Sequence, residues 1–232
     1  MASYALFTEP LIREMLARVL FIWNVRHPAS GYVQGINYLC VPFVITYLSD
    51  YISIDYEKMG YKKSELLALD NKSLQCLEAD IYWSLCKMLE KMQDVYTVNQ
   101  PGAHKIINKM KEIVKRVDLE LYEHIEKNSV NLVPIAFRWV NCFFTREFTL
   151  DKVIRMWDTY FAEVENMGVF HVYVCASLLL HLKSDIMKKD FSSLMLYLQS
   201  LPTMKWTSDE LGILLAKSYQ LKSFFHKTKH IV

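Results

Sequence analysis

Apolar residues along the chain recur at the three- and four-residue spacing of amphipathic helices. One stripe begins at Ile12, just after Pro10 at a favourable first-turn position, and ends at Trp23; a second runs from Leu74 to Met92. The 6 glycines and 6 prolines lie mainly at the boundaries of such stretches. Further helical patterns cover roughly residues 103–116, 119–125, 133–145, 150–161, 169–182, 191–200 and 209–225.

These patterns predict an all-α fold: a single multi-helix domain, arranged as a non-repeating helical array. Polar residues that could cap helices precede several stripes, namely Asn71 or Ser73, Thr149, and the segment 207–210. Residues 49–70 have the least regular pattern and are interpreted as a long, partly mobile surface connection. Residues 32–48 are apolar enough to suggest a membrane span, but they contain polar residues and a proline, so a buried helix is expected.

Composition then narrows the class of protein. A hydrophobic content of 52% supplies an ample core, and a net charge of +2 is too mild for a nucleic-acid-binding face. The 5 cysteines are scattered through apolar sequence, and no pair has zinc-ligand spacing, so we expect reduced core thiols and no metal site. No secretory signal opens the chain, which favours a cytoplasmic protein.

One short segment contains a candidate catalytic residue. Gln34 lies between Gly31 and Gly35, directly after the helix-ending Arg26-His27-Pro28. Pro28 disfavours helical geometry at His27, and the glycines permit turns that bulkier residues resist. A glutamine displayed at such a junction can both accept and donate hydrogen bonds, as the orientation of a nucleophilic water requires. The alternative is a polar loop that only turns a corner.

Other catalytic motifs are missing. The sequence has no phosphate-binding loop, no set of kinase motifs and no Gly-x-Ser-x-Gly nucleophile elbow. His171 and His181 lie in apolar helical sequence, where hydrogen-bonded core or surface histidines are expected rather than metal ligands.

A second dense region runs over residues 137–148 and 154–158. It alternates arginines with aromatic residues and includes Trp139 and Trp157. We expect the aromatic side chains to pack in the core while the arginines pair with carboxylates such as Glu147 and Asp158. The predicted task of this region is to hold the Gln34 junction rigid.

At this point the residues resemble a known family. The string from Arg26 to Asn37 (RHPASGYVQGIN) is similar to the Tyr-x-Gln-Gly motif of TBC domains, the GTPase activators of Rab proteins. Downstream, Phe137-Arg138-Trp139, Arg146-Glu147 and Arg155-Met156-Trp157-Asp158 match the later motifs of that family in order and spacing. The match covers Leu6 to the C-terminal region and resembles most the subfamily of the yeast Golgi TBC activator and its animal relatives.

The resemblance implies a two-residue mechanism. Gln34 would orient the water that attacks GTP on a bound Rab protein, and an arginine from an upstream Ile-x-x-Asp-x-x-Arg motif would neutralise the developing charge. Tyr32 and Gly35 would shape the loop, supported by Arg138, Trp139, Trp157 and Asp158. GTP and Mg²⁺ would belong to the Rab protein, so no cofactor of this chain is expected. The implied setting is vesicle trafficking and intracellular protein transport, with the protein cytoplasmic or peripheral at Golgi or other endomembranes.

The chain also departs from the family pattern. No Ile-x-x-Asp-x-x-Arg occurs in it, and Arg13, Arg18 and Arg26 do not match the catalytic arginine. We therefore expect residues 1–232 to be a TBC domain without its arginine-motif portion, and weak or no stimulation of hydrolysis from the chain as given. Two alternatives remain: a TBC-type module that binds GTPases without activating them, and an all-helical adaptor for other partners.

Overall fold

The computed structural model describes residues 5–56, 60–163 and 167–227. Helices dominate this part of the chain, which confirms the all-α prediction. The helices and strands are η1 (Ala5–Thr8), α1 (Pro10–Arg26), α2 (Ile36–Leu48), β1 (Ile54–Asp55), β2 (Gly60–Tyr61), α3 (Lys63–Leu67), α4 (Asn71–Glu90), η2 (Gln93–Val95), α5 (Pro101–Val117), α6 (Leu119–Lys127), α7 (Leu132–Cys142), α8 (Leu150–Ala162), α9 (Met167–His181), α10 (Lys183–Ile186), α11 (Phe191–Gln199), η4 (Pro202–Lys205) and α12 (Ser208–Lys227).

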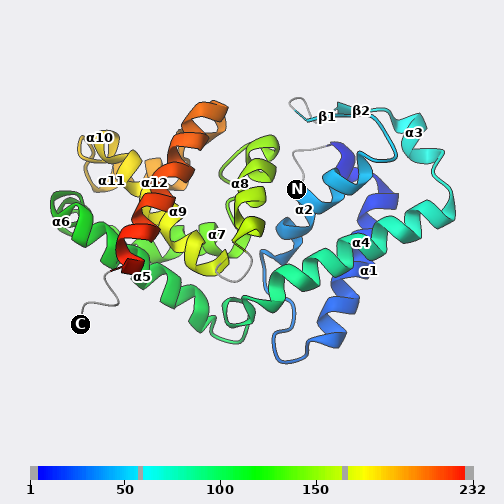
Figure 1. Cartoon of the computed structure of the whole chain (residues 1–232), viewed down its shortest axis with the longest axis horizontal. Coiled ribbons are helices and arrows are strands. Elements are labelled where there is room, and N and C mark those ends of the chain that lie inside the picture. Colours follow the sequence, from blue (N-terminus) through cyan, green and yellow to red (C-terminus); the bar gives the residue numbers. More distant parts are fainter. Residues whose placement is uncertain (1–4, 57–59, 164–166, 228–232) are drawn as a thin grey trace.

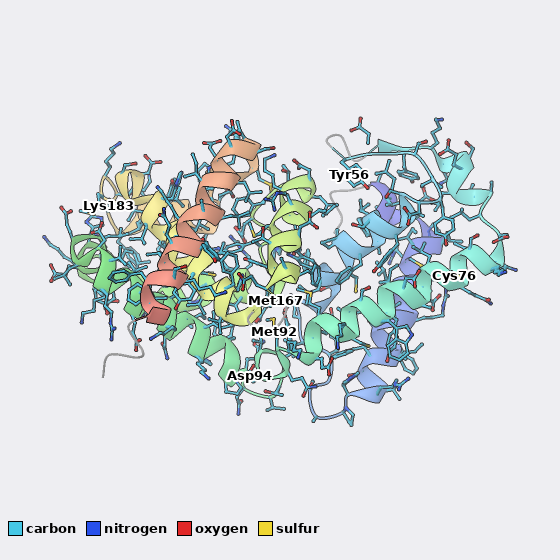
Figure 2. All side chains as sticks on the ribbon, viewed as in Figure 1. Tyr56, Cys76, Met92, Asp94, Met167 and Lys183 are labelled. Atoms are coloured by element: carbon cyan, nitrogen blue, oxygen red, sulfur yellow. The ribbon has the colours of Figure 1, made fainter. Side chains whose placement is uncertain are left out.

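Figure 1 shows two groups of helices side by side. The amino-terminal half comprises α1 to α4, in which α4 packs against both α1 and α2. The carboxyl-terminal half comprises α5 to α12 and is built around α9, which packs against α5 and α12. The halves meet where α2 contacts α7 and α8. In Figure 2, Met92 and Met167 both lie near this junction.

Helix α2 is central because most of its side chains are apolar and buried, including Pro42 inside the helix. It begins at Ile36, four residues later than the buried helix expected from residue 32, because the preceding residues form the Gln34 turn. Within the described residues, no helix is both long and apolar enough to cross a membrane.

Capping side chains determine where two of the helices begin. At the start of α4, the Asp70 side chain accepts a hydrogen bond from the backbone N–H of Ser73 at 2.7 Å, so Asp70 is the cap rather than Asn71 or Ser73. At the start of α12, Thr207 Oγ1 accepts from the Glu210 N–H at 3.3 Å while the Glu210 carboxylate accepts from the Thr207 N–H at 2.6 Å. This reciprocal pair is a capping box, which explains why the last helix begins where the sequence predicts.

The described parts of this connection, residues 49–56 and 60–70, include regular elements that the sequence did not predict. They contain the short antiparallel β1–β2 hairpin and α3. Side chains tie the segment to its surroundings: Tyr61 Oη donates to Glu9 Oε1 at 2.8 Å, and the Ser53 N–H donates to Glu65 Oε2 at 2.8 Å. The sequence did not reveal the strand pair because two-residue strands leave no alternating pattern to detect, and the partial mobility of this connection stays a prediction.

The cysteines are all free, as expected, but not all lie in the core. Cys40, Cys142 and Cys175 are buried, whereas Cys76 is exposed on α4 (Figure 2) and Cys86 is partly exposed. Lys183, labelled in Figure 2, forms ion pairs with Asp118, the cap residue of α6, at 2.7 Å and with Glu120 in α6 at 2.7 Å.

A buried polar network crosses the carboxyl-terminal half. His171 on α9 is fully buried, with Nδ1 2.9 Å from Tyr160 Oη and Nε2 3.6 Å from Cys175 Sγ. Burial lowers the pKa of His171 to about 3, so the imidazole is neutral. His171 is thus the hydrogen-bonded core histidine that its apolar sequence context predicts.

Candidate functional site

The segment between α1 and α2 displays Gln34 as the glycine spacing predicts. Helix α1 ends where the His27 ring stacks on Trp23 with centroids 3.6 Å apart. The chain then turns through Gly31, at φ +64°, and Gly35, at φ +125°. Both φ values are ones that residues with a Cβ rarely adopt. Gln34 is exposed between them, and no described residue is hydrogen-bonded to its amide.

Gly35 also packs closely against the carboxyl-terminal half. A Cβ at this position would lie 3.0 Å from the backbone oxygen of Asn141 and 3.2 Å from its Cβ. The same Asn141 oxygen accepts a hydrogen bond from the Tyr96 hydroxyl at 3.1 Å. Tyr96 is buried, which raises its pKa well above the ordinary value and keeps the hydroxyl as a donor. The Gln34 turn therefore packs against α7 at the Asn141 carbonyl, whose position the Tyr96 hydrogen bond fixes.

Both halves line a surface depression of about 540 Å³ beside Gln34. The amino-terminal half contributes the Gln34 turn and the first turn of α2, and the carboxyl-terminal half contributes the start of α5 and one side of α7 with the turn after it. The lining residues are Val33, Gln34, Gly35, Tyr38, Gln100, Phe137, Arg138, Asn141, Cys142 and Arg146.

The turn after α7 is strained and well supported. Phe143 and Phe144 have φ values of +46° and +62°, which is uncommon for two consecutive bulky residues. Trp157 Nε1 donates to the Phe143 oxygen at 3.1 Å, and the Phe143 ring stacks on His171 with centroids 4.2 Å apart. The predicted helix over residues 133–145 therefore stops at Cys142, because these contacts hold the backbone in a left-handed conformation.

An ion pair braces the same turn from the other side. Arg138 Nε and Nη2 lie 2.5 and 2.8 Å from the two carboxylate oxygens of Glu147, and Nη2 also donates to the Gln199 oxygen at 2.9 Å. Glu147 is only 3% exposed. Burial raises the pKa of its carboxyl, and the Arg138 guanidinium opposes that rise. The predicted pairing of Arg138 with Glu147 is present.

The predicted pairing of an arginine with Asp158 is absent from the described residues. Arg155 Nη1 donates to Thr159 Oγ1 at 2.9 Å, and Asp158 is exposed without an ion pair to any described cation. Arg155 and Asp158 are both on solvent-facing positions of α8, where a threonine one turn away is the nearer partner.

The structure brings together only part of the predicted site. Gln34, Gly35 and Arg138 line the depression, and Tyr32 is 49% exposed next to it. Trp139 and Trp157 are buried beneath the turn, whereas Asp158 does not line the depression. The supporting roles proposed for these residues remain predictions.

The residues missed as site residues include four polar or charged ones that line the depression, which are Tyr38, Gln100, Asn141 and Arg146, and Tyr96, which supports it. Asn141 and Arg146 lie within the second dense region, so the sequence marked their neighbourhood without their roles. Gln100 and Tyr96 carry no such signal, because only the packing of the two halves brings them near the Gln34 turn. Tyr38 follows Gln34 by four residues, but no sequence motif singles it out. Within the described ranges, no group of three histidine, cysteine or acidic residues is arranged to hold a metal ion.

Comparisons with known proteins agree with this arrangement. The sequence profile of the Rab-GTPase-TBC domain matches residues 2–187. TBC1 domain family member 22B of Homo sapiens is 42% identical over 221 residues, covering 95% of this chain and 43% of that protein. GTPase-activating protein gyp1 of Schizosaccharomyces pombe is 41% identical over 224 residues, covering 96% and 43%. This chain thus spans less than half the length of these curated relatives.

A solved structure extends the likeness to three dimensions. The Ypt/Rab-GAP domain of Gyp1p superimposes with a TM-score of 0.91 and 37% sequence identity. The alignment covers 96% of this chain and 69% of the solved one.

Proposed function

Because the chain belongs to the Rab-GTPase-TBC domain family, we propose that it acts on a Rab-family small GTPase in its GTP form and promotes GTP hydrolysis. Gln34 is the proposed catalytic residue, supplied in trans. The observation that carries the proposal is the Gln34 turn itself, in which an exposed amide stands between two positive-φ glycines at the edge of a depression. The proposed setting is the cytoplasm at Golgi or other endomembranes, within vesicle trafficking.

The chemistry asked of Gln34 is positioning. In phosphoryl transfer from GTP, catalysis consists mainly of orienting the attacking water and stabilising charge. A glutamine amide can accept a hydrogen bond from that water through its carbonyl and donate through its N–H. Gly35 supports this role because its close approach to the Asn141 oxygen fixes the backbone next to Gln34. An amide on a fixed turn loses little freedom on reaching the reacting atoms.

Charge stabilisation is the second requirement. In the family that the motifs resemble, an arginine of an Ile-x-x-Asp-x-x-Arg motif meets the developing phosphate charge. The 232 residues contain no such motif. An arginine finger contributes roughly 10³ to 10⁵ in rate, so we expect the chain alone to stimulate hydrolysis weakly or not at all.

Single-turnover hydrolysis tests the proposal. A panel of GTP-loaded Rab proteins is mixed with the wild-type chain, with Gln34→Ala and with Gln220→Ala, an exposed glutamine on α12 far along the chain from the turn. We expect binding and a small stimulation from the wild type and from Gln220→Ala, and loss of that stimulation in Gln34→Ala with the fold intact. A measurable stimulation that is equal for wild type and Gln34→Ala would make Gln34 an ordinary loop residue.

The non-catalytic alternative has its own supporting observation. A second groove of about 740 Å³ lies between α1 and α4, and Trp83 at its edge is 61% exposed. Exposed aromatic surface of this kind is typical of sites that bind partner helices. Rab binding that is equally tight to the GTP and GDP forms and gives no stimulation would favour a binding module, and no Rab binding at all would favour the adaptor.

A further inference from the structure

Three arginines belong to the aromatic region around α7 and α8, and they differ in what they contact. Arg138 is paired with Glu147, and Arg155 donates to Thr159. Arg146 is exposed, lines the depression beside Gln34, and forms no ion pair with any carboxylate that the structure describes. Arg146 is therefore a cation at the candidate site whose guanidinium is not paired with any described carboxylate, although its charge also acts on the neighbouring Glu147.

The backbone on both sides of Arg146 is fixed. The N–H and Oγ1 of Thr145 both donate to the Cys142 oxygen, at 2.9 and 2.7 Å. On the other side, the Glu147 N–H donates to the Phe144 oxygen at 2.9 Å, and the Glu147 side chain is held by its ion pair. The Arg146 side chain thus begins from a rigid point, although its own head is exposed.

The head of Arg146 is also oriented. Its Cζ lies 5.1 Å from the centre of the Tyr38 ring, within the range of a cation–π contact. Tyr38 is in the first turn of α2, directly after the Gln34 turn. A neutral ring aligns a guanidinium without cancelling its charge, so the donors of Arg146 remain available for an anion. Little side-chain entropy is then lost when a ligand binds.

We propose that Arg146 binds an anionic oxygen group of the GTPase complex that docks at the Gln34 depression. This inference rests on the proposed function. The group is either a carboxylate on the GTPase surface or a phosphate oxygen of its nucleotide, since a guanidinium donates paired N–H groups to both. Arg146 is in this account a contact residue that completes the site alongside Gln34.

The test is equilibrium binding of the full chain to a panel of Rab proteins, loaded either with a non-hydrolysable GTP analogue or with GDP and aluminium fluoride. The variants are Arg146→Gln, Arg146→Lys and, as a matched control, Arg155→Gln. We expect Arg146→Gln to weaken binding about tenfold, Arg146→Lys to restore part of it, and Arg155→Gln to bind as the wild type does. Because Arg146 is exposed, its variants should keep the wild-type unfolding midpoint.

The two sources of the anion give different results. A carboxylate predicts the same weakening with both nucleotide states, and a non-additive effect when one acidic residue of the GTPase is neutralised together with Arg146. A phosphate predicts a greater weakening in the aluminium fluoride complex. Equal affinities of wild type and Arg146→Gln in both states would overturn this inference alone. Failure of the wild type to bind any Rab protein would overturn the proposed function and this inference with it.

Discussion

Replacement of Gly35 by alanine tests whether the Gln34 turn depends on the contact with α7. Gly35 has φ +125°, and its added Cβ would lie 3.0 Å from the Asn141 oxygen and 3.2 Å from the Asn141 Cβ. The backbone strain costs about 1–3 kcal/mol, and relief of the close contact costs a further 1–3 kcal/mol. We expect a loss of about 3 kcal/mol in the free energy of unfolding, or a fall of roughly 6–12 °C in the unfolding midpoint.

Two other glycines supply graded controls. Gly31 has φ +64°, but its added Cβ would meet nothing closer than Asn24 Oδ1 at 3.6 Å, so Gly31→Ala should lose only about 1 kcal/mol. Gly212 lies in α12 with no atom within 4 Å of an added Cβ, and Gly212→Ala should gain about 0.5–1 kcal/mol through helix propensity.

Urea and thermal unfolding of the three variants would establish the order. The reasoning requires Gly35→Ala to be the least stable and Gly212→Ala the most stable. A midpoint for Gly35→Ala within about 2 °C of the wild type would refute it, because the turn would then have moved away from Asn141 at little cost.

Two further predictions concern buried ionisable groups. Arg138→Met leaves the buried Glu147 carboxylate without its partner and should lower stability at pH 7 by about 3 kcal/mol. Burial already raises the pKa of Glu147, and more so without Arg138, so the folded variant takes up a proton before the unfolded chain does as the pH falls. The stability lost relative to the wild type should therefore be smaller at pH 5 than at pH 7 in urea unfolding. An equal loss at the two pH values would contradict this. His171 has a pKa lowered to about 3 by burial, so below its ordinary value of 6.5 the unfolded chain binds a proton that the folded one does not. Stability should therefore fall on acidification by up to about 1.4 kcal/mol per pH unit, and His171→Gln should flatten that slope; parallel slopes for the two proteins would contradict the assignment.

The sequence predicts most of the helices because apolar periodicity is a local signal. It does not predict where α7 ends, since Phe143 and Phe144 adopt positive φ without the glycine that usually marks such a stop. The left-handed turn is stabilised instead by distant groups, among them Trp157. Tertiary contacts thus override the propensity of two bulky residues.

Part of the candidate site can likewise be predicted from local sequence, and part depends on contacts between distant residues. The Gln34 turn can be predicted because two glycines and a proline lie within the twelve residues from Arg26 to Asn37. The support of Gly35 by the Asn141 oxygen and the stacking of Arg146 on Tyr38 join residues about a hundred positions apart. Such pairs leave no local pattern, so sequence reasoning named Gln34, Gly35 and Arg138 but missed Asn141 and Arg146.

The Asn141 oxygen has a consequence for association. It is contacted by Gly35 from the amino-terminal half and by the Tyr96 hydroxyl from the segment that leads into the carboxyl-terminal half. A hinge opening between the halves would have to separate Gly35 from this oxygen, which the Tyr96 hydroxyl holds in place because η2, directly before Tyr96, packs against α5. The depression is therefore expected to keep its width when a partner arrives, so docking would proceed as a near-rigid-body event with a small loss of conformational entropy.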